Sequence, residues 1–249
     1  MSAANEGQTG RKRPVRYLKG DMRERTLLNA ARDVFLEGGW DTFSMERVAE
    51  YLECSRTLVY NHFTCKEELL LALDIESKLK RLGMSELVLK FQGRPRERMV
   101  ALDQMEVFLF DRHLPVELFV TSARLRVKTS SERQQRLKEL ELRTVSIGAS
   151  IVEEGLACGD LPPLKHFNAD EIYFALWSSL WGATSIARSD FPYAESGVKS
   201  PTRTSRLALL YMLDGFGWRP LTHEWDYLAT CKRVEAEIFS TEAFKAASA

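Results

Sequence analysis

The stretch Ser44–Lys66 limits the possible folds of this chain more than any other part of its sequence. It contains two short helical patterns, and Glu53–Ser55 separates them. In the first pattern, apolar residues recur at three- and four-residue spacing within Val48–Leu52, which gives a short helix one face for packing. The second pattern covers Arg56–Phe63. Two helices joined this closely predict a helix-turn-helix.

Serine residues mark the start of both helices. Ser44 and Ser55 are predicted as N-caps, because a serine hydroxyl can accept a hydrogen bond from a backbone N–H that has no partner within the helix. In the second helix, Val59 and Phe63 are predicted to point inward together. The inward face of this helix is therefore apolar.

The opposite face of the second helix is polar and aromatic. It presents Arg56, Thr57, Tyr60 and Asn61, which form two pairs of neighbours one helical turn apart. Arginine can reach guanine or phosphate, threonine, tyrosine and asparagine can bond phosphates or base edges, and Leu58 can touch a thymine methyl. This face suits a DNA groove, although the same side chains also suit the ordinary surface of a helical bundle.

Lys66 stands at the start of the next predicted helix, where its positive charge opposes the helix dipole. A lysine at this position is explained if its partner is a phosphate outside the protein. With this lysine, the segment resembles the DNA-binding domain of the TetR family of bacterial repressors. The resemblance is carried by Phe35, Gly39, Ser44, Val48-Ala49, Ser55-Arg56, Val59-Tyr60, His62-Phe63 and Lys66-Glu67-Glu68-Leu69. It implies that the residues at or near DNA are Ser44, Ser55, Arg56, Thr57, Leu58, Tyr60, Asn61, His62 and Lys66.

Three positions depart from the usual pattern of that family. Glu53 occupies the turn position at which the family usually has glycine, so a left-handed backbone there would cost about 1 kcal/mol. Thr57 replaces a frequent glycine, and Leu58 replaces a frequent threonine or alanine. These departures are expected to change the operator sequence more than the fold.

Positive charge is concentrated at one end of the chain. The 35 Lys and Arg residues are balanced by 35 Asp and Glu residues, so any attraction to a polyanion must be local. Within residues 1–20, five basic side chains stand against the single acid Glu6. We expect a disordered basic tail there, which is either a solvated charge run or an arm that reaches phosphates or a minor groove.

Cysteine spacing and hydrophobicity bear on the location of the protein. Cys54, Cys65, Cys158 and Cys231 show no CxxC spacing, which disfavours a zinc site and a disulfide framework and favours a reducing cytoplasm. No apolar segment follows the basic N-terminus as in a secretory signal. The longest apolar stretch, Ile172–Ala187, contains serines and a threonine and falls short of a membrane span. We expect a soluble, cytoplasmic protein with no membrane partner.

The rest of the chain shows helical periodicity and no convincing strand pattern, so the predicted fold class is all-α. Helices are expected at Asp21–Glu37, Lys66–Leu82, Pro95–Leu109, Pro115–Leu125, Ser131–Ala157, Ile172–Arg188, Pro201–Asp214 and Thr222–Ile238. A small polar tail is expected after the last of them. The predicted domains are a basic tail at 1–20, a three-helix helix-turn-helix domain at 21–66, a shared connecting helix at 67–82 and a larger helical bundle at 83–249.

Capping signals support several of these boundaries. Asp21 with Glu24, and Asn168 with Glu171, have the spacing of a capping box, in which the two side chains bond each other's backbone N–H groups. Gly38–Gly39 is predicted to end the first helix.

No catalytic constellation occurs in the sequence. It lacks the GxxxxGK[ST], HExxH and GxSxG motifs, and it has no GxGxxG after a strand. His62, His113, His166 and His223 are isolated, and each is more simply a structural or surface residue than a metal ligand. We therefore predict a protein that is not an enzyme and uses no metal or cofactor.

The resemblance implies a homodimeric repressor that binds a two-fold operator of double-stranded DNA and is released by a small molecule. A dimer is also expected because one short helix contacts too few bases for strong specificity. The predicted dimer interface is Tyr173, Leu176, Leu180, Trp181, Thr184, Leu207, Leu210 and Tyr211. The predicted effector site is Met99, Leu102, Met105, Phe108, Phe119, Arg124, Ile147 and Trp177. Its effector is expected to be largely hydrophobic, with one or two polar groups met by Arg124 or His113.

Several alternatives remain open at the level of sequence. Trp177 and Trp181 can be dimer anchors, core residues or pocket walls. A protein partner can replace the small effector in controlling the helix-turn-helix. A helical interaction protein that does not bind DNA is a further alternative, which the departure at Glu53 keeps open.

Overall fold

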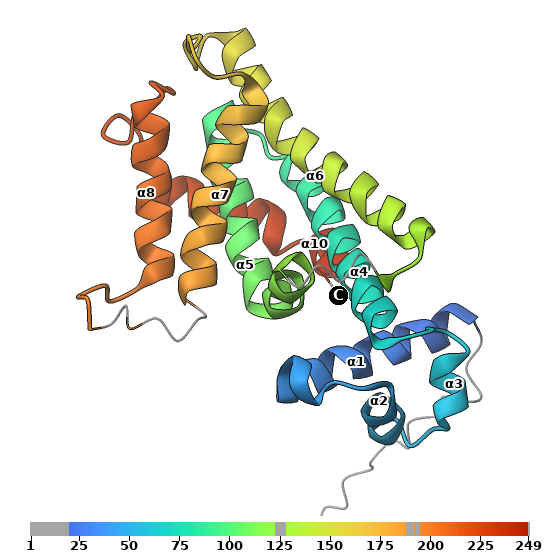
Figure 1. Cartoon of the computed structure of the whole chain (residues 1–249). Coiled ribbons are helices and arrows are strands. Elements are labelled where there is room, and N and C mark those ends of the chain that lie inside the picture. Colours follow the sequence, from blue (N-terminus) through green and yellow to red (C-terminus); the bar gives the residue numbers. More distant parts are fainter. Residues whose placement is uncertain (1–19, 123–127, 188–191, 193–194, 249) are drawn as a thin grey trace, which may run out of the picture. The chain divides into compact units, whose positions relative to one another are not determined.

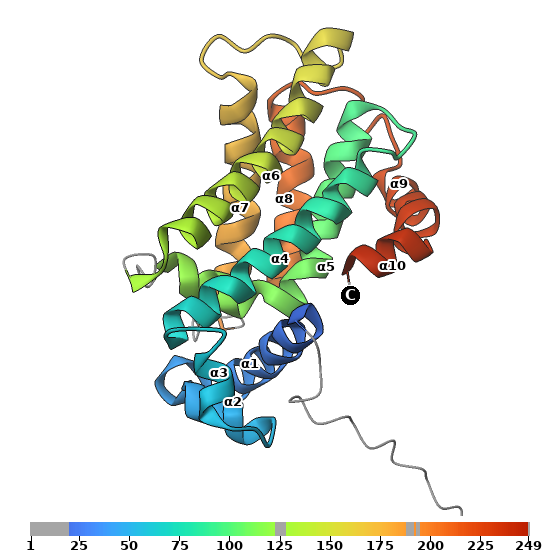
Figure 2. The same ribbon diagram turned by 90° about the vertical axis from the view of Figure 1, so that its right-hand side faces the viewer.

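The computed structural model describes residues 20–122, 128–187, 192 and 195–248. In this described part every regular element is a helix, as the predicted all-α fold requires (Figures 1 and 2). The α-helices are α1 Gly20–Thr42, α2 Met45–Tyr51, α3 Arg56–Tyr60, α4 Lys66–Val88, α5 Pro95–Ser122, α6 Ser131–Cys158, α7 Ala169–Ala187, α8 Pro201–Gly215, α9 Tyr227–Val234 and α10 Glu242–Ser248, with the π-helix η3 at Glu235–Phe239. The predicted basic tail lies outside the described residues except for Gly20.

The chain divides into two compact units. The first consists of Met1–Leu73 and Arg124–Ser130, and the second of Asp74–Ala123 and Ser131–Ala249. The division falls within α4, so this helix contributes to both units. α4 ends at Val88 rather than near the predicted Leu82, because Met84 and Val88 are fully buried in the core of the second unit.

The first unit is a three-helix core in which α1 packs on α2 and α2 packs on α3. Its helix α1 begins at Gly20, one residue before the predicted cap Asp21. The helical conformation breaks at Gly39, with φ 62° and ψ −171°, a combination that is essentially restricted to glycine. The predicted stop at Gly38–Gly39 is therefore confirmed, and one further turn follows before α2.

The second unit is built around α5, α6, α7 and α8, with α6 packed on α7 and α7 packed on α8 (Figure 1). The predicted separate helix from Pro115 is wrong, because α5 continues through this proline to Ser122. A proline inside a helix removes one backbone hydrogen bond, and the remaining turns of a helix as long as α5 can carry that loss. The predicted end of α6 is confirmed to within one residue.

Side-chain caps fix the starts of α7 and α8. The predicted capping box of α7 is present, because Glu171 N–H donates to Asn168 Oδ1 at 2.9 Å and Asn168 N–H donates to Glu171 Oε2 at 2.8 Å. Ser200 caps α8 by accepting a hydrogen bond from Arg203 N–H at 3.3 Å. The tight sequence spacing of Asn168 and Glu171 made the capping box of α7 predictable.

The C-terminal segment differs from its prediction of one helix over Thr222–Ile238 with a polar tail. The helix α9 begins only at Tyr227 with Asp226 as its N-cap, and α10 follows η3. The aromatic ring of Phe244 in α10 is 1% exposed and lies 4.5 Å from that of Phe239, centroid to centroid. Burial of this single aromatic residue explains why the predicted tail is ordered as a helix.

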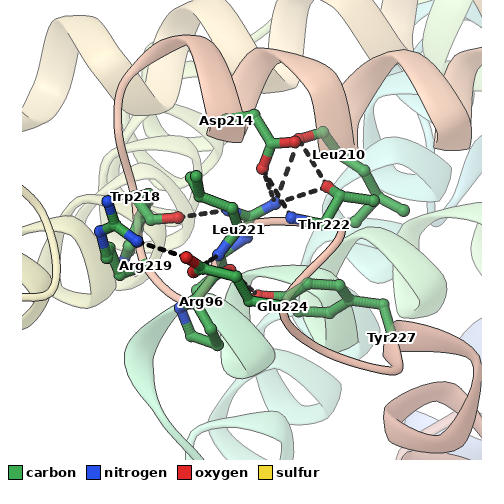
Figure 3. A network of polar contacts seen from close by, with 10 residues as sticks. Arg96, Leu210, Asp214, Trp218, Arg219, Leu221, Thr222, Glu224 and Tyr227 are labelled. Atoms are coloured by element: carbon green, nitrogen blue, oxygen red, sulfur yellow. Dashed lines mark hydrogen bonds and ion pairs between the residues drawn. The ribbon is translucent and has the colours of Figure 1, made fainter.

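A buried arginine ties this C-terminal segment to the bundle (Figure 3). Arg96 of α5 donates to Asp214 Oδ1 at 2.7 Å, to Thr222 Oγ1 at 3.0 Å and to the backbone carbonyls of Leu210 and Trp218. Its guanidinium also lies 4.8 Å from the ring centre of Tyr227. A buried charge needs such partners, so this network holds α5, α8 and the start of the C-terminal segment together.

Two further properties concern the described residues as a whole. None of their helices combines the length and the apolar character that crossing a bilayer requires. Cys54, Cys65, Cys158 and Cys231 are all free thiols.

Candidate functional site

The short helix α3 has one buried side and one exposed side. Ser55 caps it, as predicted, by accepting a hydrogen bond from Leu58 N–H at 3.3 Å, and Val59 is completely buried. The predicted DNA-contacting residues on the exposed side are Ser55, Arg56, Thr57, Tyr60 and Asn61, while Leu58 and His62 are half-buried. One end of the helix is thus fixed by a cap and one face by the core, which leaves a rigid polar face toward solvent.

The turn before α3 takes the conformation that its sequence position suggested. Glu53 has φ 50°, so the left-handed backbone considered for this turn is present although the residue is not glycine. A side chain in this conformation costs about 1 kcal/mol. The turn therefore persists because the two helices that it joins are both packed, and the departure at Glu53 does not disrupt the helix-turn-helix.

Three of the predicted DNA-contacting residues meet around one open hollow in the first unit. The hollow has a volume of about 250 Å³ and is lined by Ser44, Met45, Glu46, Tyr60, Thr64, Cys65, Lys66 and Glu67. It brings together the starts of α2 and α4 and the end of α3. Ser44 also caps α2, since its Oγ accepts a hydrogen bond from Arg47 N–H at 3.2 Å.

Lys66 has partners inside the protein that the sequence did not suggest. Its Nζ donates to the carbonyl oxygen of Phe43 at 3.3 Å and lies 3.7 Å from the ring centre of Trp40. The cation–π contact stabilises the charge at this helix start, so an external phosphate is not required to explain it. An ammonium has three donors, and contact with phosphate remains a prediction for this residue.

Glu46 is a residue of this surface that the sequence analysis missed. Its Oε1 accepts a hydrogen bond from the Tyr60 hydroxyl at 3.2 Å. A hydrogen bond from its own backbone N–H is the main cause that lowers the pKa of Glu46, and the Tyr60 hydroxyl adds to it. Partial burial and the bond to Glu46 raise the pKa of Tyr60, so the phenol stays protonated and acts as the donor.

The start of α4 is also contacted by residues from the connection between α5 and α6. Lys128 Nζ lies 3.3 Å from Glu67 Oε1, and Ser130 N–H donates to Glu68 Oε1. The Cys65 thiol lies 3.8 Å from the carbonyl oxygen of Lys128. No periodicity in the sequence relates these positions, so only the tertiary structure could bring them together.

The cavities of the second unit include the following three, which described residues line. The first, of about 20 Å³, is lined by Met99, Leu102, Asp103, Glu106, Tyr173, Leu176, Trp177, Leu180 and Leu209. The second, of about 190 Å³, is lined by Lys78, Arg81, Glu141, Thr144, Val145, Tyr173, Trp177 and Trp181. The third, of about 630 Å³, is lined by Val100, Asp103, Ser200, Thr202, Arg203, Arg206, Leu207, Leu209, Leu210, Tyr227, Leu228 and Cys231.

The predicted effector residues are only partly brought together. Met99, Leu102 and Trp177 line the first cavity. Met105 is fully buried in the main core, where the Ser85 hydroxyl lies 3.7 Å from its sulfur.

Two more of the predicted effector residues line none of these cavities. Phe108 packs on the rings of Phe239 and Phe244, and Ile147 lies in a separate small core with Leu82 and Leu140. The side chains of Phe119, Arg124 and His113 lie outside the described part of the structure. Helical periodicity identified the apolar face of each helix but could not show which part of that face meets a cavity.

The predicted dimer interface divides into buried and exposed residues. Tyr173, Leu176 and Leu180 are at most 5% exposed and face the core of their own subunit, so they are not available to a partner. Trp181, Thr184 and Leu210 are half-buried, whereas Leu207 and Tyr211 are 41% and 68% exposed. One side of α7 is covered by its own chain, and the other side carries Phe174, which is 62% exposed.

Known proteins resemble this chain both in its helix-turn-helix sequence and in its fold. Residues 27–73 match the model of the family described as bacterial regulatory proteins, tetR family. Among curated protein sequences, no relative matches the chain. A similar solved structure is the TetR family transcriptional regulator PfmR from Thermus thermophilus, with 20% identity, a TM-score of 0.60 and coverage of 76% of this chain and 97% of that one.

Two further structures have the same fold. SmeT, the repressor of the Stenotrophomonas maltophilia multidrug efflux pump SmeDEF, has 19% identity and a TM-score of 0.56 over 78% of this chain and 89% of its own. The transcriptional regulator FadR from Bacillus subtilis, solved in complex with stearoyl-CoA, has 18% identity and a TM-score of 0.57 over 77% of this chain and 98% of its own.

The two kinds of similarity support different statements. Identities this low establish a shared fold, whereas the family model matches the helix-turn-helix itself, including both of its helices and the start of α4. Members of this family are regulators and not enzymes. Residues 27–73 therefore form a DNA-binding helix-turn-helix of the tetR family, and the chain has the fold of solved TetR-family transcriptional regulators.

Proposed function

We propose that this regulator is a repressor that binds a two-fold operator as a homodimer and is released by a small, largely hydrophobic effector. The observation that carries the proposal is the exposed face of α3, on which Arg56, Thr57, Tyr60 and Asn61 are free of the core that holds Val59. Side chains of these types read base edges and phosphates when a helix enters the major groove.

The dimer is supported by apolar side chains that one subunit leaves exposed. On α7, Phe174 and Ile186 are 62% and 50% exposed, and on α8, Leu207 and Tyr211 are 41% and 68% exposed. These two helices pack on each other, so the side chains belong to neighbouring surfaces. Large exposed apolar patches are uncommon on monomers. In a dimer, α7 and α8 would pair with the same helices of the partner subunit and cover these side chains.

The effector is supported by the cavities of the second unit. The cavity of about 190 Å³ has walls of Tyr173, Trp177 and Trp181, which can enclose an apolar ligand. FadR of Bacillus subtilis, which has a similar fold, binds stearoyl-CoA in its solved complex. We therefore assign effector binding to this cavity and to the smaller cavity that shares Tyr173 and Trp177 with it.

The switch follows from the continuity of α4 through both units. A ligand that shifts α4 would change the spacing of the two recognition helices from the roughly 34–36 Å that successive major grooves require. Coupling of this kind is reciprocal. A ligand that lowers DNA affinity a hundredfold must bind the DNA complex a hundredfold less well, which corresponds to about 2.7 kcal/mol.

DNA recognition is tested by selecting bound fragments from random duplex DNA with the purified protein. We expect an enriched sequence with two related half-sites, about 10 base pairs or a multiple of this apart. Binding should weaken steeply as salt rises, because phosphate contacts release counterions. Failure to enrich any sequence at low salt would favour the alternative of a helical interaction protein without DNA binding.

Effector control is tested with the selected operator and a cell-metabolite extract. We expect a compound in the extract to release a labelled operator, and Val145→Trp to abolish this release, because Val145 lines the 190 Å³ cavity and is 41% exposed. Leu142→Trp is the matched control, since Leu142 lies on the same helix, is 60% exposed and does not line that cavity. Release by a protein fraction alone would favour control by a protein partner.

A further inference from the structure

The cavity of about 20 Å³ in the second unit contains two acidic side chains in an otherwise apolar wall. Asp103 and Glu106 of α5 line it together with Tyr173 and Trp177 and with the side chains of methionine and leucine residues. None of the described residues that line this cavity is basic. Positions three apart on a helix lie on one face, so the two carboxyl groups are neighbours. A buried carboxyl group is costly unless its oxygens have hydrogen-bond partners, so the partners of these two acids matter.

Each carboxyl group has a fully buried oxygen that lacks a hydrogen-bond donor. Asp103 is 7% exposed and Glu106 is 3% exposed. Glu106 Oε2 is paired with Arg81, and Asp103 Oδ2 lies 3.8 Å from Arg206 Nε, beyond hydrogen-bond distance. The other oxygens, Asp103 Oδ1 and Glu106 Oε1, are buried and have no donor. An unpaired buried acceptor destabilises the folded protein, so a ligand that supplies donors to these oxygens would gain affinity.

The donor set suits an ammonium group better than a metal ion. Hard divalent cations take six or more oxygen ligands, whereas this wall offers two carboxyl groups among apolar side chains. Within the described part of the chain, no three metal-ligating side chains come together. A primary ammonium has three N–H donors for two acceptors and is attracted to the faces of aromatic rings such as Tyr173 and Trp177.

We propose that the effector site recognises a primary amine with an apolar tail, whose ammonium group binds between Asp103 and Glu106. This inference rests on the proposed effector control and names the chemical class of the effector. The volume of about 20 Å³ is enough for a group the size of one water molecule. The tail extends along Trp177 into the cavity of about 190 Å³, which shares Tyr173 and Trp177 with the small one.

Four probes of equal chain length separate the contributions of charge and donors. Hexylammonium, hexyltrimethylammonium, hexanol and hexanoate are titrated into the full-length protein, and tryptophan fluorescence and calorimetry report binding. We expect hexylammonium to bind at least about tenfold more tightly than each of the other three, because it alone combines positive charge with N–H donors. Equal or tighter binding of hexanol or hexanoate would overturn the proposal, and so would equal binding of hexyltrimethylammonium.

A variant then tests the assigned residues. Asp103→Asn keeps the shape of the side chain and should reduce the preference for hexylammonium over hexanol at least about tenfold. Glu153→Gln, on the exposed surface of α6, is the matched control and should keep the preference. An unchanged preference in a folded Asp103→Asn protein would refute the assignment.

Operator release is measured separately with the same probes. Amine binding without operator release would support the amine site and refute the proposal that this site controls DNA binding. Operator release by hexanol or hexanoate, with no preference for the amine, would support effector control and refute the inference.

Discussion

The Tyr60 hydroxyl of α3 donates a hydrogen bond to the Glu46 carboxylate of α2, with 3.2 Å between Oη and Oε1. This bond holds a recognition side chain against a negative charge at the proposed DNA surface. Phosphate repels a carboxylate, so Glu46 opposes binding to any sequence while it orients Tyr60. The relationship predicts that affinity and specificity respond differently to changes at these two residues.

Glu46→Gln should strengthen binding to all duplexes by about threefold to tenfold at low salt, because one repulsive charge is removed while an acceptor for Tyr60 remains. Tyr60→Phe should leave the nonspecific affinity nearly unchanged. Fluorescence anisotropy with operator and random duplexes at several salt concentrations measures both effects. Weaker nonspecific binding by Glu46→Gln would show that Glu46 does not face the phosphates.

Arg56→Ala should lower operator affinity by about 1–3 kcal/mol and relax the base preference, as expected for an exposed arginine that reads a base. Lys66→Ala should instead weaken binding to all DNA sequences alike and reduce by about one the slope of log affinity against log salt concentration. Because Lys66 also contacts Phe43 and Trp40, its variant should lose some thermal stability, whereas Arg56→Ala should not. Competition binding and thermal melts test the pair, and equal operator affinity in Arg56→Ala and wild type would contradict this role of α3.

Glu53→Gly should stabilise the protein by about 0.5–1 kcal/mol, because it removes the strain of a side chain at φ 50°. Glu50→Gly is the matched control, since this residue lies within α2 and glycine there should cost about 1 kcal/mol. Urea unfolding of both variants gives the comparison. If both substitutions destabilised the protein equally, the left-handed turn would not be strained.

Asp103 should make stability depend on pH. Burial raises the pKa of Asp103 to about 7 in the folded protein, from its ordinary value of 3.8, against the opposing effect of Arg206. The folded state then holds a proton that the unfolded chain releases, so this group destabilises the fold progressively as pH rises from about 4 to 7. Glu106 on α5, Arg206 and Arg203 on α8 and Cys231 and Tyr227 on α9 line the cavities that Asp103 also lines.

The wild type should therefore lose about 2–3 kcal/mol of unfolding free energy from pH 5 to pH 8 that Asp103→Asn does not lose. Urea unfolding at the two pH values, with Asp170→Asn on the exposed surface of α7 as the control, measures the difference. A pH-independent difference would mean that the buried carboxyl group is ionised throughout this range.

Tyr211→Glu should convert the dimer to monomers at micromolar concentration, because it places a charge in the proposed interface of α7 and α8. Leu228→Glu on α9 is the control, since Leu228 is also highly exposed, at 67% against 68% for Tyr211. Analytical ultracentrifugation distinguishes the two. A wild-type protein that is monomeric at this concentration would remove both the interface and the two-half-site operator.

The local signals in the sequence were sufficient for most helices and for the helix-turn-helix. The caps Ser44, Ser55 and Asn168 act on backbone groups within three residues, so their roles follow from spacing alone. The outward face of α3 was equally predictable, since Val59 fixes which side is buried. The left-handed backbone at Glu53 followed from its place in the turn.

Only the tertiary structure decided which side chains share a cavity or an interface. Tyr173, Leu176 and Leu180 have the same apolar chemistry as an interface residue, and their burial in the subunit depends on how α5, α6 and α8 surround α7. Asp103 and Glu106 appeared in the sequence as two ordinary acids in a helix. Their burial, their unpaired oxygens and their shared cavity arise from packing between helices far apart in the chain, and helical periodicity carries no information about such contacts.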